Sequence, residues 1–323
     1  MNVEVGVVII GRNEGDRLIQ CLKSLSKFTP QIVYVDSSSS DNSLEEAKNH
    51  GAHAVSLDMS QGFTAARARN AGFKKIIEIY PDLTFIQFVD GDCEVLEGWI
   101  ENSVLFLKNN SHVAVVNGVL DERFPNKTIY NRMCDSEWKT PTGELKYCGG
   151  NALMRVDAFK NEGGFLPDLI AGEEPELCIR LRRSGWKIWH LNHPMMLHDA
   201  NITSFFQWWK RTMRAGYAFA EGANLHGVAP EYHWIKESRR AWFWGFILPI
   251  ITLVMFFLNW KIALILLLVY PLQIVKLTFK RNNPINFYFA FFLVLGKFAE
   301  AIGQLKFLKK RYLKEKAQLI EYK

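Results

Sequence analysis

The fold is decided near the start of the chain, where residues 3–36 read VEVGVVIIGRNEGDRLIQCLKSLSKFTPQIVYVD. Residues 3–10 form an almost unbroken aliphatic run, as expected for a strand that is covered on both faces. Residues 16–28 follow with apolar side chains at helical spacing. Residues 32–35 form a second aliphatic run, which ends at Asp36. This order predicts a strand, a helix and a second strand parallel to the first.

The same alternation continues along the first third of the chain. It predicts a helix, a strand, a helix and a strand, at residues 43–50, 54–57, 64–79 and 84–89. Alternating elements in this order predict an α/β, Rossmann-like fold with a mostly parallel sheet and helices on both faces. Further along, residues 171–177 open another helix that runs to about Ser184, and residues 186–191 and 195–198 are strand candidates.

The composition is that of a folded protein with an uneven charge distribution. The chain has 323 residues, of which 49% are hydrophobic and 22% charged, and this excludes wholesale disorder. Its length allows about two domains. The formal net charge is +6, and residues 241–323 alone carry 12 basic and 3 acidic residues. The five cysteines form no CxxC pair, so we expect reduced thiols on the cytosolic side rather than a zinc ribbon. The first residues are expected to form a buried strand, not a secretory signal.

Three stretches near the C-terminal end lack charged residues, at residues 242–258, 262–275 and 282–296. A membrane span needs about 20 residues, with a range down to about 17, so the first stretch is long enough. The second requires its flanking lysines to snorkel. Basic residues before the first stretch and after the second favour a membrane hairpin at residues 242–275. The sheet domain then lies on the cytoplasmic side of a plasma membrane or cell inner membrane.

The third charge-free stretch is expected to form an interfacial helix over residues 285–305, because Lys297 and Glu300 interrupt it. The basic tail, residues 306–323, is expected to contact anionic lipid head groups. Basic charge beside apolar segments points to lipid, and we expect no nucleic-acid partner. The near absence of ionisable residues inside the apolar runs argues against a transporter.

Polar clusters follow three of the predicted strands, at residues 11–14, 36–41 and 90–92. In open α/β sheets ligands bind outside the carboxyl ends of the strands, where a parallel order brings these clusters together. The Asp-Gly-Asp sequence at 90–92 can reach one divalent cation or its diphosphate ligand, because Mg²⁺ and Mn²⁺ prefer carboxylate and phosphate oxygens.

Other charged residues suggest contacts to a nucleotide. A carboxylate at Asp36 can accept the imide N–H of uracil or thymine, whereas Asp41 is expected to cap a helix. Arg67 and Arg69 lie two residues apart on a predicted helix and therefore point to different sides. We expect Arg69 to face a diphosphate.

Ordered motifs along residues 3–200 resemble the successive signatures of family 2 glycosyltransferases of the GT-A fold. They are VVIIGRNE, YVDSSSSDNS, ARNAG, FVDGDCEV, GGNALMRVDAF, GGF and GEEPELCIRLRRSGW. The resemblance implies that a sugar passes from a nucleotide-diphosphate donor to an acceptor hydroxyl, with inversion and with Mn²⁺ or Mg²⁺. It implies that Asp36 reads the nucleobase, that Asp90 contacts the ribose or the metal, and that Asp92 binds the metal.

The same resemblance extends to the rest of the site. The residues expected to bind the nucleotide sugar are Asn13, Glu14, Asp36, Arg69, Asp90, Gly149 and Gly150. The catalytic base of the family sits in a Glu-Asp pair, which here reads Glu173-Glu174. Glu174 takes the catalytic place, with one methylene more than Asp, and Glu173 and Glu176 compete for the role. His198 is expected to complete the metal site, with Asp199 as the alternative ligand.

The segment QWWKR at residues 207–211 resembles the Gln-x-x-Arg-Trp motif of processive polysaccharide synthases, with a departure. Lys210 stands at the Arg place and Arg211 at the Trp place. Trp208, Trp209 and Arg211 are candidates for the acceptor or membrane side, the tryptophans by stacking on sugars. Because one apolar hairpin makes a polymer channel hard to build, we expect addition of a single sugar.

The sequence thus predicts a membrane-attached transferase with a catalytic domain at residues 1–235 and membrane-associating helices at 236–323. Asp36 favours a UDP-sugar donor, and the membrane segment favours a lipid-linked or polysaccharide acceptor near the membrane. One alternative is a sugar nucleotidyltransferase, although the early loop lacks a Gly-rich, Lys-containing phosphate cradle. A second is a non-catalytic membrane scaffold, although acids fill the metal and base positions.

Overall fold

The computed structural model describes residues 4–280, 286–313 and 320–321. The chain divides into two compact units, Met1–Thr203 and Ser204–Lys323. This division precedes helix α8 (Phe205–His226), whereas the sequence places the domain boundary near residue 235. Helix α8 packs along α12 (Asn286–Leu313) and therefore belongs to the second unit.

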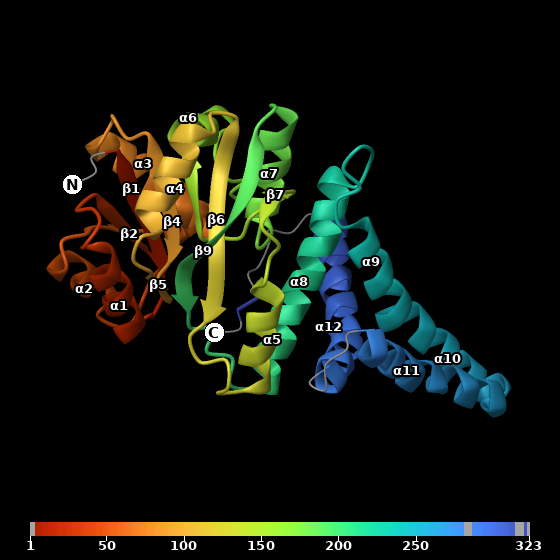
Figure 1. Ribbon diagram of the computed structural model, residues 1–323. Coiled ribbons are helices and arrows are strands. Elements are labelled where there is room, and N and C mark those ends of the chain that lie inside the picture. Colours follow the sequence, from red (N-terminus) through yellow and green to blue (C-terminus); the bar gives the residue numbers. More distant parts are fainter. Residues whose placement is uncertain (1–3, 281–285, 314–319, 322–323) are drawn as a thin grey trace. The chain divides into compact units, whose positions relative to one another are not determined.

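The first unit is built on one nine-stranded sheet (Figure 1). Its order is β3 (His53–Ser56), β2 (Ile32–Asp36), β1 (Val5–Gly11), β4 (Phe85–Asp90), β8 (Ala152–Arg155), β6 (Val113–Glu122), β9 (Lys187–His198) and β5 (Cys93–Val95), with β7 (Gly143–Leu145) beside β9. Strands β3, β2, β1 and β4 are parallel, which confirms the order predicted for them. Beyond β4 only β6 and β9 pair in parallel, so the complete sheet is mixed.

Seven helices accompany the sheet in the described part of this unit. They are α1 (Asp16–Leu25), α2 (Ser43–Asn49), α3 (Ala65–Ile79), α4 (Trp99–Asn109), α5 (Ile129–Trp138), α6 (Val156–Asn161) and α7 (Glu173–Arg183). Strand β1 separates two buried clusters. Val7 and Ile9 pack with the cluster that includes α1 and α4, and Val8 and Ile10 pack with the cluster that includes α3 and α7. Helices therefore cover both faces, as the unbroken aliphatic run of β1 predicts.

One pair of predicted strands is merged in the structure. Residues 186–191 and 195–198 belong to the single strand β9. Its register against β6 shifts on either side of Val119, which lies opposite Pro194. Proline cannot donate to a ladder, and this explains why the sequence pattern is interrupted there while the strand continues.

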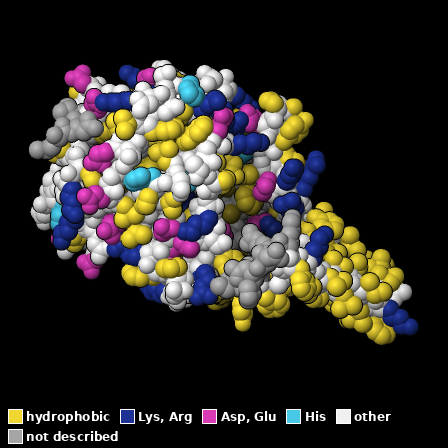
Figure 2. All heavy atoms as spheres, viewed as in Figure 1, with side chains coloured by type: hydrophobic (Ala, Val, Ile, Leu, Met, Phe, Trp, Pro, Cys, Tyr) yellow, Lys and Arg dark blue, Asp and Glu magenta, His cyan; other side chains and the backbone are white. Residues whose placement is uncertain are grey.

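The second unit is helical in its described residues. After α8 it contains α9 (Ile235–Trp242), a π-helical turn (Phe243–Ile247), α10 (Leu248–Leu258), α11 (Trp260–Lys280) and α12. Helices α10 and α11 form a hairpin that is covered with hydrophobic side chains in Figure 2. Among the residues that the structure describes, three stretches are long and apolar enough to cross a membrane, namely Ile235–Leu258, Trp260–Phe279 and Phe287–Leu313. Residues 314–319 and 322–323 of the predicted basic tail lie outside the described residues.

Candidate active site

The carboxyl ends of β1, β2 and β4 bring the three predicted polar clusters together. Gly11 pairs with Asp36 across the β1–β2 ladder, and Ile10 pairs with Asp90 across the β1–β4 ladder. The Gly91 N–H donates to the Ile10 carbonyl over 2.8 Å. The convergence expected from the parallel order is therefore confirmed.

Asp36 is buried at the end of β2 and lines a pocket. Its carboxylate accepts hydrogen bonds from the Ser39 N–H over 2.9 Å and from the Tyr34 hydroxyl over 3.1 Å. Burial, and then the Asp36 charge, raise the pKa of Tyr34, so its hydroxyl remains a donor. The pocket has a volume of about 410 Å³ and is lined by Asp36, Ser38, Ser39, Asp41, Asn42, Leu44, Glu45, Ser56, Leu57 and Met59. Seven of these ten residues are polar or charged, and Leu44, Leu57 and Met59 are apolar.

Asn13 and Glu14 hold the loop after β1 against its neighbours. The Asn13 side-chain oxygen accepts the Ser40 N–H over 2.7 Å, which ties this loop to the loop after β2. Glu14 pairs with Arg17 over 2.7 Å, and a Cβ added to Gly91 would lie 3.1 Å from the Glu14 Cγ. Both residues thus lie at the sheet edge where the sequence places them.

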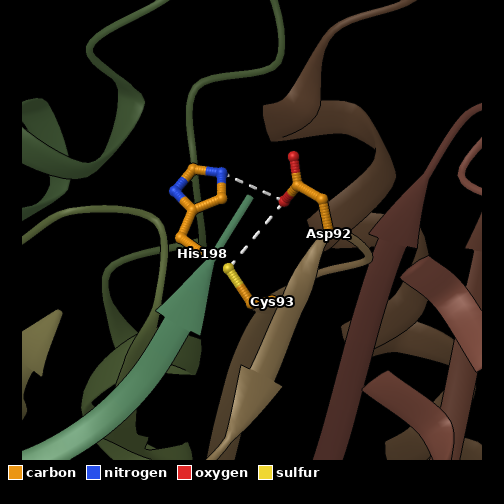
Figure 3. Close-up of side chains that lie close together, drawn as sticks. All are labelled: Asp92, Cys93 and His198. Atoms are coloured by element: carbon orange, nitrogen blue, oxygen red, sulfur yellow. Dashed lines mark hydrogen bonds and ion pairs between the residues drawn. The ribbon is translucent and has the colours of Figure 1, made fainter. Parts of the chain in front are cut away.

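Asp92, Cys93 and His198 form a candidate metal centre (Figure 3). Asp92 immediately precedes β5, Cys93 begins it, and His198 ends β9 opposite Cys93. The His198 Nε2 is 3.2 Å from the Asp92 Oδ1, and the Cys93 Sγ is 3.8 Å from the same oxygen. Two ligands at adjacent positions of an octahedral ion, each at about 2.1 Å, lie about 3 Å apart. The Asp92–His198 spacing therefore fits one Mg²⁺ or Mn²⁺.

The His198 ring is held in place by Trp138, which the sequence analysis missed. The two rings stack with centroids 4.6 Å apart and an interplanar angle of 16°. Asp199, the alternative ligand, accepts the Asn201 N–H over 3.1 Å with its carboxylate. Its own N–H donates to the Asp92 carbonyl. Trp138 lies in an irregular stretch of sequence, and no local pattern connects it to His198.

Arg69 lies at the centre of a second cluster, the Arg69 cluster, formed with Asp90, Glu173 and Glu174. Its Nη1 donates to Glu173 and to Glu174, and its Nη2 donates to Asp90, each over 2.8 Å. The Arg69 side chain is 3% exposed. Its contact with the donor diphosphate stays a prediction, because both terminal nitrogens already bind carboxylates. Arg67 points elsewhere, as the helical spacing predicts, and donates to the Asp58 and Gly62 carbonyls.

Gly150 makes room for this cluster. A Cβ added to Gly150 would lie 2.2 Å from the Arg69 Nη2 and 2.9 Å from the Glu174 Oε1, whereas one added to Gly149 would meet nothing within 4 Å. Asn151, next in the chain, accepts the Asp90 N–H over 2.9 Å. Asn151 is a second residue that the sequence analysis missed, although it stands in the quoted motif GGNALMR.

Glu174 has the properties of a base among the candidate acids. Burial, and then the neighbouring Glu173 charge, raise the pKa of Glu174 to about 7, while Arg69 opposes this shift. The Glu174 side chain is 12% exposed and that of Glu173 is 4% exposed. Glu176 forms an ion pair with Arg180 over 2.7 Å, which favours a structural role. A carboxylate with a pKa near neutrality is suited to accepting a proton.

Trp208, Trp209 and Arg211 lie on α8 in the second unit. Trp208 is 3% exposed and packs edge-to-face on Phe292 of α12, with centroids 4.9 Å apart. Trp209 is half-buried and lies 5.6 Å from the Phe205 ring. Their assignment to the acceptor or membrane side stays a prediction.

The fold of the first unit belongs to the GT-A type. Residues 6–163 match the sequence model of the family described as "Glycosyl transferase family 2". This stretch is a family 2 glycosyltransferase domain, and the protein is a glycosyltransferase.

Two named proteins have similar sequences. "Glycosyltransferase AglE" of Haloferax volcanii is 24% identical over 227 residues, which are 66% of this chain and 71% of that protein. "Succinoglycan biosynthesis protein ExoA" of Rhizobium meliloti is 24% identical over 196 residues, which are 57% of this chain and 58% of that protein.

A solved structure is similar over most of the chain. It is the mannosyltransferase PcManGT from Pyrobaculum calidifontis, in complex with GDP-Man and Mn²⁺. The TM-score is 0.62 at 14% identity, and the match covers 94% of this chain and 87% of that chain. At this level of identity the likeness establishes the fold.

Proposed function

We propose that the protein is an inverting, metal-dependent glycosyltransferase that transfers a single sugar from a nucleotide-diphosphate sugar. The acceptor is a hydroxyl of a membrane-proximal or lipid-linked glycan. The observation that carries the proposal is the arrangement at one sheet edge. There Asp36 ends β2 and Asp90 ends β4, close to β1 between them. Asp90 binds Arg69, and Asp92, two residues later, pairs with His198 at the end of β9.

The donor base binds in the pocket beside Asp36. Its carboxylate retains acceptor capacity for an imide N–H, which favours uridine. The complex of PcManGT with GDP-Man makes guanosine the competing base. Asn13 shapes this pocket by holding the loops after β1 and β2 together.

Asp92 and His198 hold the divalent cation, which when bound stabilises the negative charge on the departing diphosphate. A carboxylate and an imidazole suit Mn²⁺, and the carboxylate suits Mg²⁺. Trp138 and the β5–β9 ladder orient the two ligands.

Glu174 accepts the proton of the acceptor hydroxyl. The acceptor oxygen attacks the anomeric carbon opposite the diphosphate, and the bond from that carbon to the diphosphate oxygen breaks. The proton passes to a Glu174 carboxylate oxygen. Arg69 holds Glu174 and Asp90 in fixed positions, so that the base and the donor side of the site keep their spacing.

Calorimetric binding of UDP, dTDP, GDP and CDP to the detergent-solubilised full chain, with and without Mn²⁺, tests the donor site. We expect one nucleotide to bind, UDP first among them, and to lose its metal-dependent affinity in Asp92→Asn. The matched control is Asp82→Asn, at an exposed position of the same unit. Asp199→Asn tests whether Asp199, the alternative metal ligand, contributes to the metal-dependent affinity. Absence of nucleotide binding by folded protein contradicts the proposal.

The products of turnover separate the transferase from a sugar nucleotidyltransferase. With a nucleotide sugar and membrane lipid extract, we expect release of a nucleoside diphosphate. Pyrophosphate formation from a sugar phosphate and a nucleoside triphosphate would instead favour the nucleotidyltransferase.

A further inference from the structure

We infer that α12 does not cross the membrane. It lies beside α8 outside the hydrocarbon core, and the aromatic N-terminal ends of these two helices contact lipid. The end of α12 therefore lies on the same side of the membrane as α8 and the catalytic unit that precedes it. The partner of these aromatic helix ends is a lipid bilayer.

Helices α8 and α12 form a parallel pair over almost their full lengths. The contacts advance together along both helices: Trp208 with Phe292, Tyr217 with Phe307, Glu221 with Lys310 and Asn224 with Arg311. Helices α8 and α12 therefore share one depth in the membrane. Helix α12 also shares this depth with the parts of the hairpin that contact it around Gly245 and Tyr270.

Glycines bring the two helices into backbone contact. A Cβ added to Gly216 would lie 2.1 Å from the Glu300 carbonyl oxygen, and one added to Gly303 would lie 2.0 Å from the Met213 carbonyl oxygen. Such close approach requires the absence of a side chain. The two helices are thus packed rigidly together, and α12 cannot enter the hydrocarbon core of the membrane without α8.

Helix α8 is too polar to lie in hydrocarbon. Its charged residues are spread along its length, at Lys210, Arg211, Arg214 and Glu221. Charged side chains at the centre of a bilayer are costly, and those in membrane-spanning segments are rare. Because α12 shares the depth of α8, it too stays outside the core.

The sequence of α12 supports the same conclusion. Its charge-free part ends at Gly296, before the Lys297–Glu300 ion pair, and residues 286–296 extend only about 16 Å as a helix. The hydrocarbon core is about 30 Å thick. Half of the Phe287–Leu313 window is buried by protein, against 17% and 6% for the windows in the other two candidate spans. The stretches Ile235–Leu258 and Trp260–Phe279 therefore expose enough apolar surface to face lipid.

The N-terminal ends of the pair carry the lipid contact. Their exposed aromatic residues are Phe205 and Phe206 on α8, and Phe287, Tyr288 and Phe291 on α12. The packing of Trp208 on Phe292 places these two ends side by side. Large exposed aromatics with basic residues following them are typical of a helix end at a membrane interface.

Site-directed labelling in oriented vesicles tests the topology. The five native cysteines are buried, so an added exposed cysteine is the main target of a membrane-impermeant maleimide. Tyr312→Cys, at a position 86% exposed, reports the end of α12, and Glu78→Cys, on α3, marks the catalytic side. We expect both to be labelled from the same face. Labelling from opposite faces overturns the inference.

A second measurement tests the lipid contact in vesicles of phosphatidylethanolamine and phosphatidylglycerol. A fluorophore is attached at Phe206→Cys and, as the matched control on the same helix, at Leu225→Cys, which is 43% exposed. Nitroxide-labelled lipid is expected to quench the probe at position 206 and to leave the probe at 225 largely unquenched. Equal quenching at both positions, or none at 206, contradicts the inference.

Discussion

Arg69 contacts every carboxylate of its cluster, with its Nη1 on Glu173 and Glu174 and its Nη2 on Asp90. At the scale of single residues, one guanidinium thus holds two acids of α7 and one of β4, and it fixes the position of Glu174, the proposed base. A lysine keeps the charge but offers a single nitrogen, which cannot make both sets of contacts.

Arg69→Lys is therefore expected to lower the transfer rate on the order of 10²-fold, the cost of a misplaced catalytic group. Arg67→Lys is the matched control, because Arg67 donates to backbone carbonyls outside the cluster, and it should keep nearly the full rate. Both rates are measured with saturating donor. Equal losses in the two variants would mean that Arg69 acts through general stability.

The pH dependence of transfer tests the role of Glu174. Its pKa is raised to about 7, chiefly by burial, so lowering the pH through this value protonates the group and removes its capacity to accept a proton. We expect the rate to fall as pH decreases through about 7, and Glu174→Gln to lose about 10²–10⁴-fold of the rate while donor binding persists. The rate of Glu173→Gln is measured for comparison, because Glu173 is the competing candidate for the base. A rate independent of pH in this range would contradict the assignment.

At the scale of elements, the sequence predicts those parts of the fold that are set by local patterns. The first four strands alternate with helices, and their aliphatic runs place Asp36 and Asp90 at one edge. Strand β8 has only four residues and pairs antiparallel with β4, as in Ile86 with Met154. No local pattern marks such a pairing, because its partner lies far away in the chain.

Local patterns also explain which site residues could be predicted from the sequence. Asp92 and His198 stand at predicted strand ends, whereas the stacking of Trp138 on His198 depends on how α5 packs. Helical spacing separates Arg67 from Arg69, but the three acidic partners of Arg69 come from two distant elements.

The turn before β8 provides a prediction at this scale. Gly150→Ala places a Cβ against the Arg69 guanidinium and should lower both the transfer rate and the melting temperature, because overpacking costs about 1–3 kcal/mol. Gly149→Ala, one residue earlier, meets open space and should change stability by less than about 0.5 kcal/mol. If the two variants behave alike, the close approach at Gly150 is not what shapes the site.

At the scale of the whole molecule, we expect membrane attachment to depend on the α10–α11 hairpin. Leu253 on α10 is 60% exposed and Ile265 on α11 is 64% exposed, which in water would leave a large apolar surface uncovered. A lysine near the centre of a membrane helix costs about 2.5–3.5 kcal/mol. The double variant Leu253→Lys/Ile265→Lys is therefore expected to reduce the fraction of protein that resists extraction from membranes by alkaline carbonate.

Leu105→Lys, at a position 57% exposed on α4, adds the same side chain to the catalytic unit and should leave that fraction unchanged. If the double variant remains in the membrane pellet like the control, the hairpin does not face lipid and the anchor lies elsewhere in the chain.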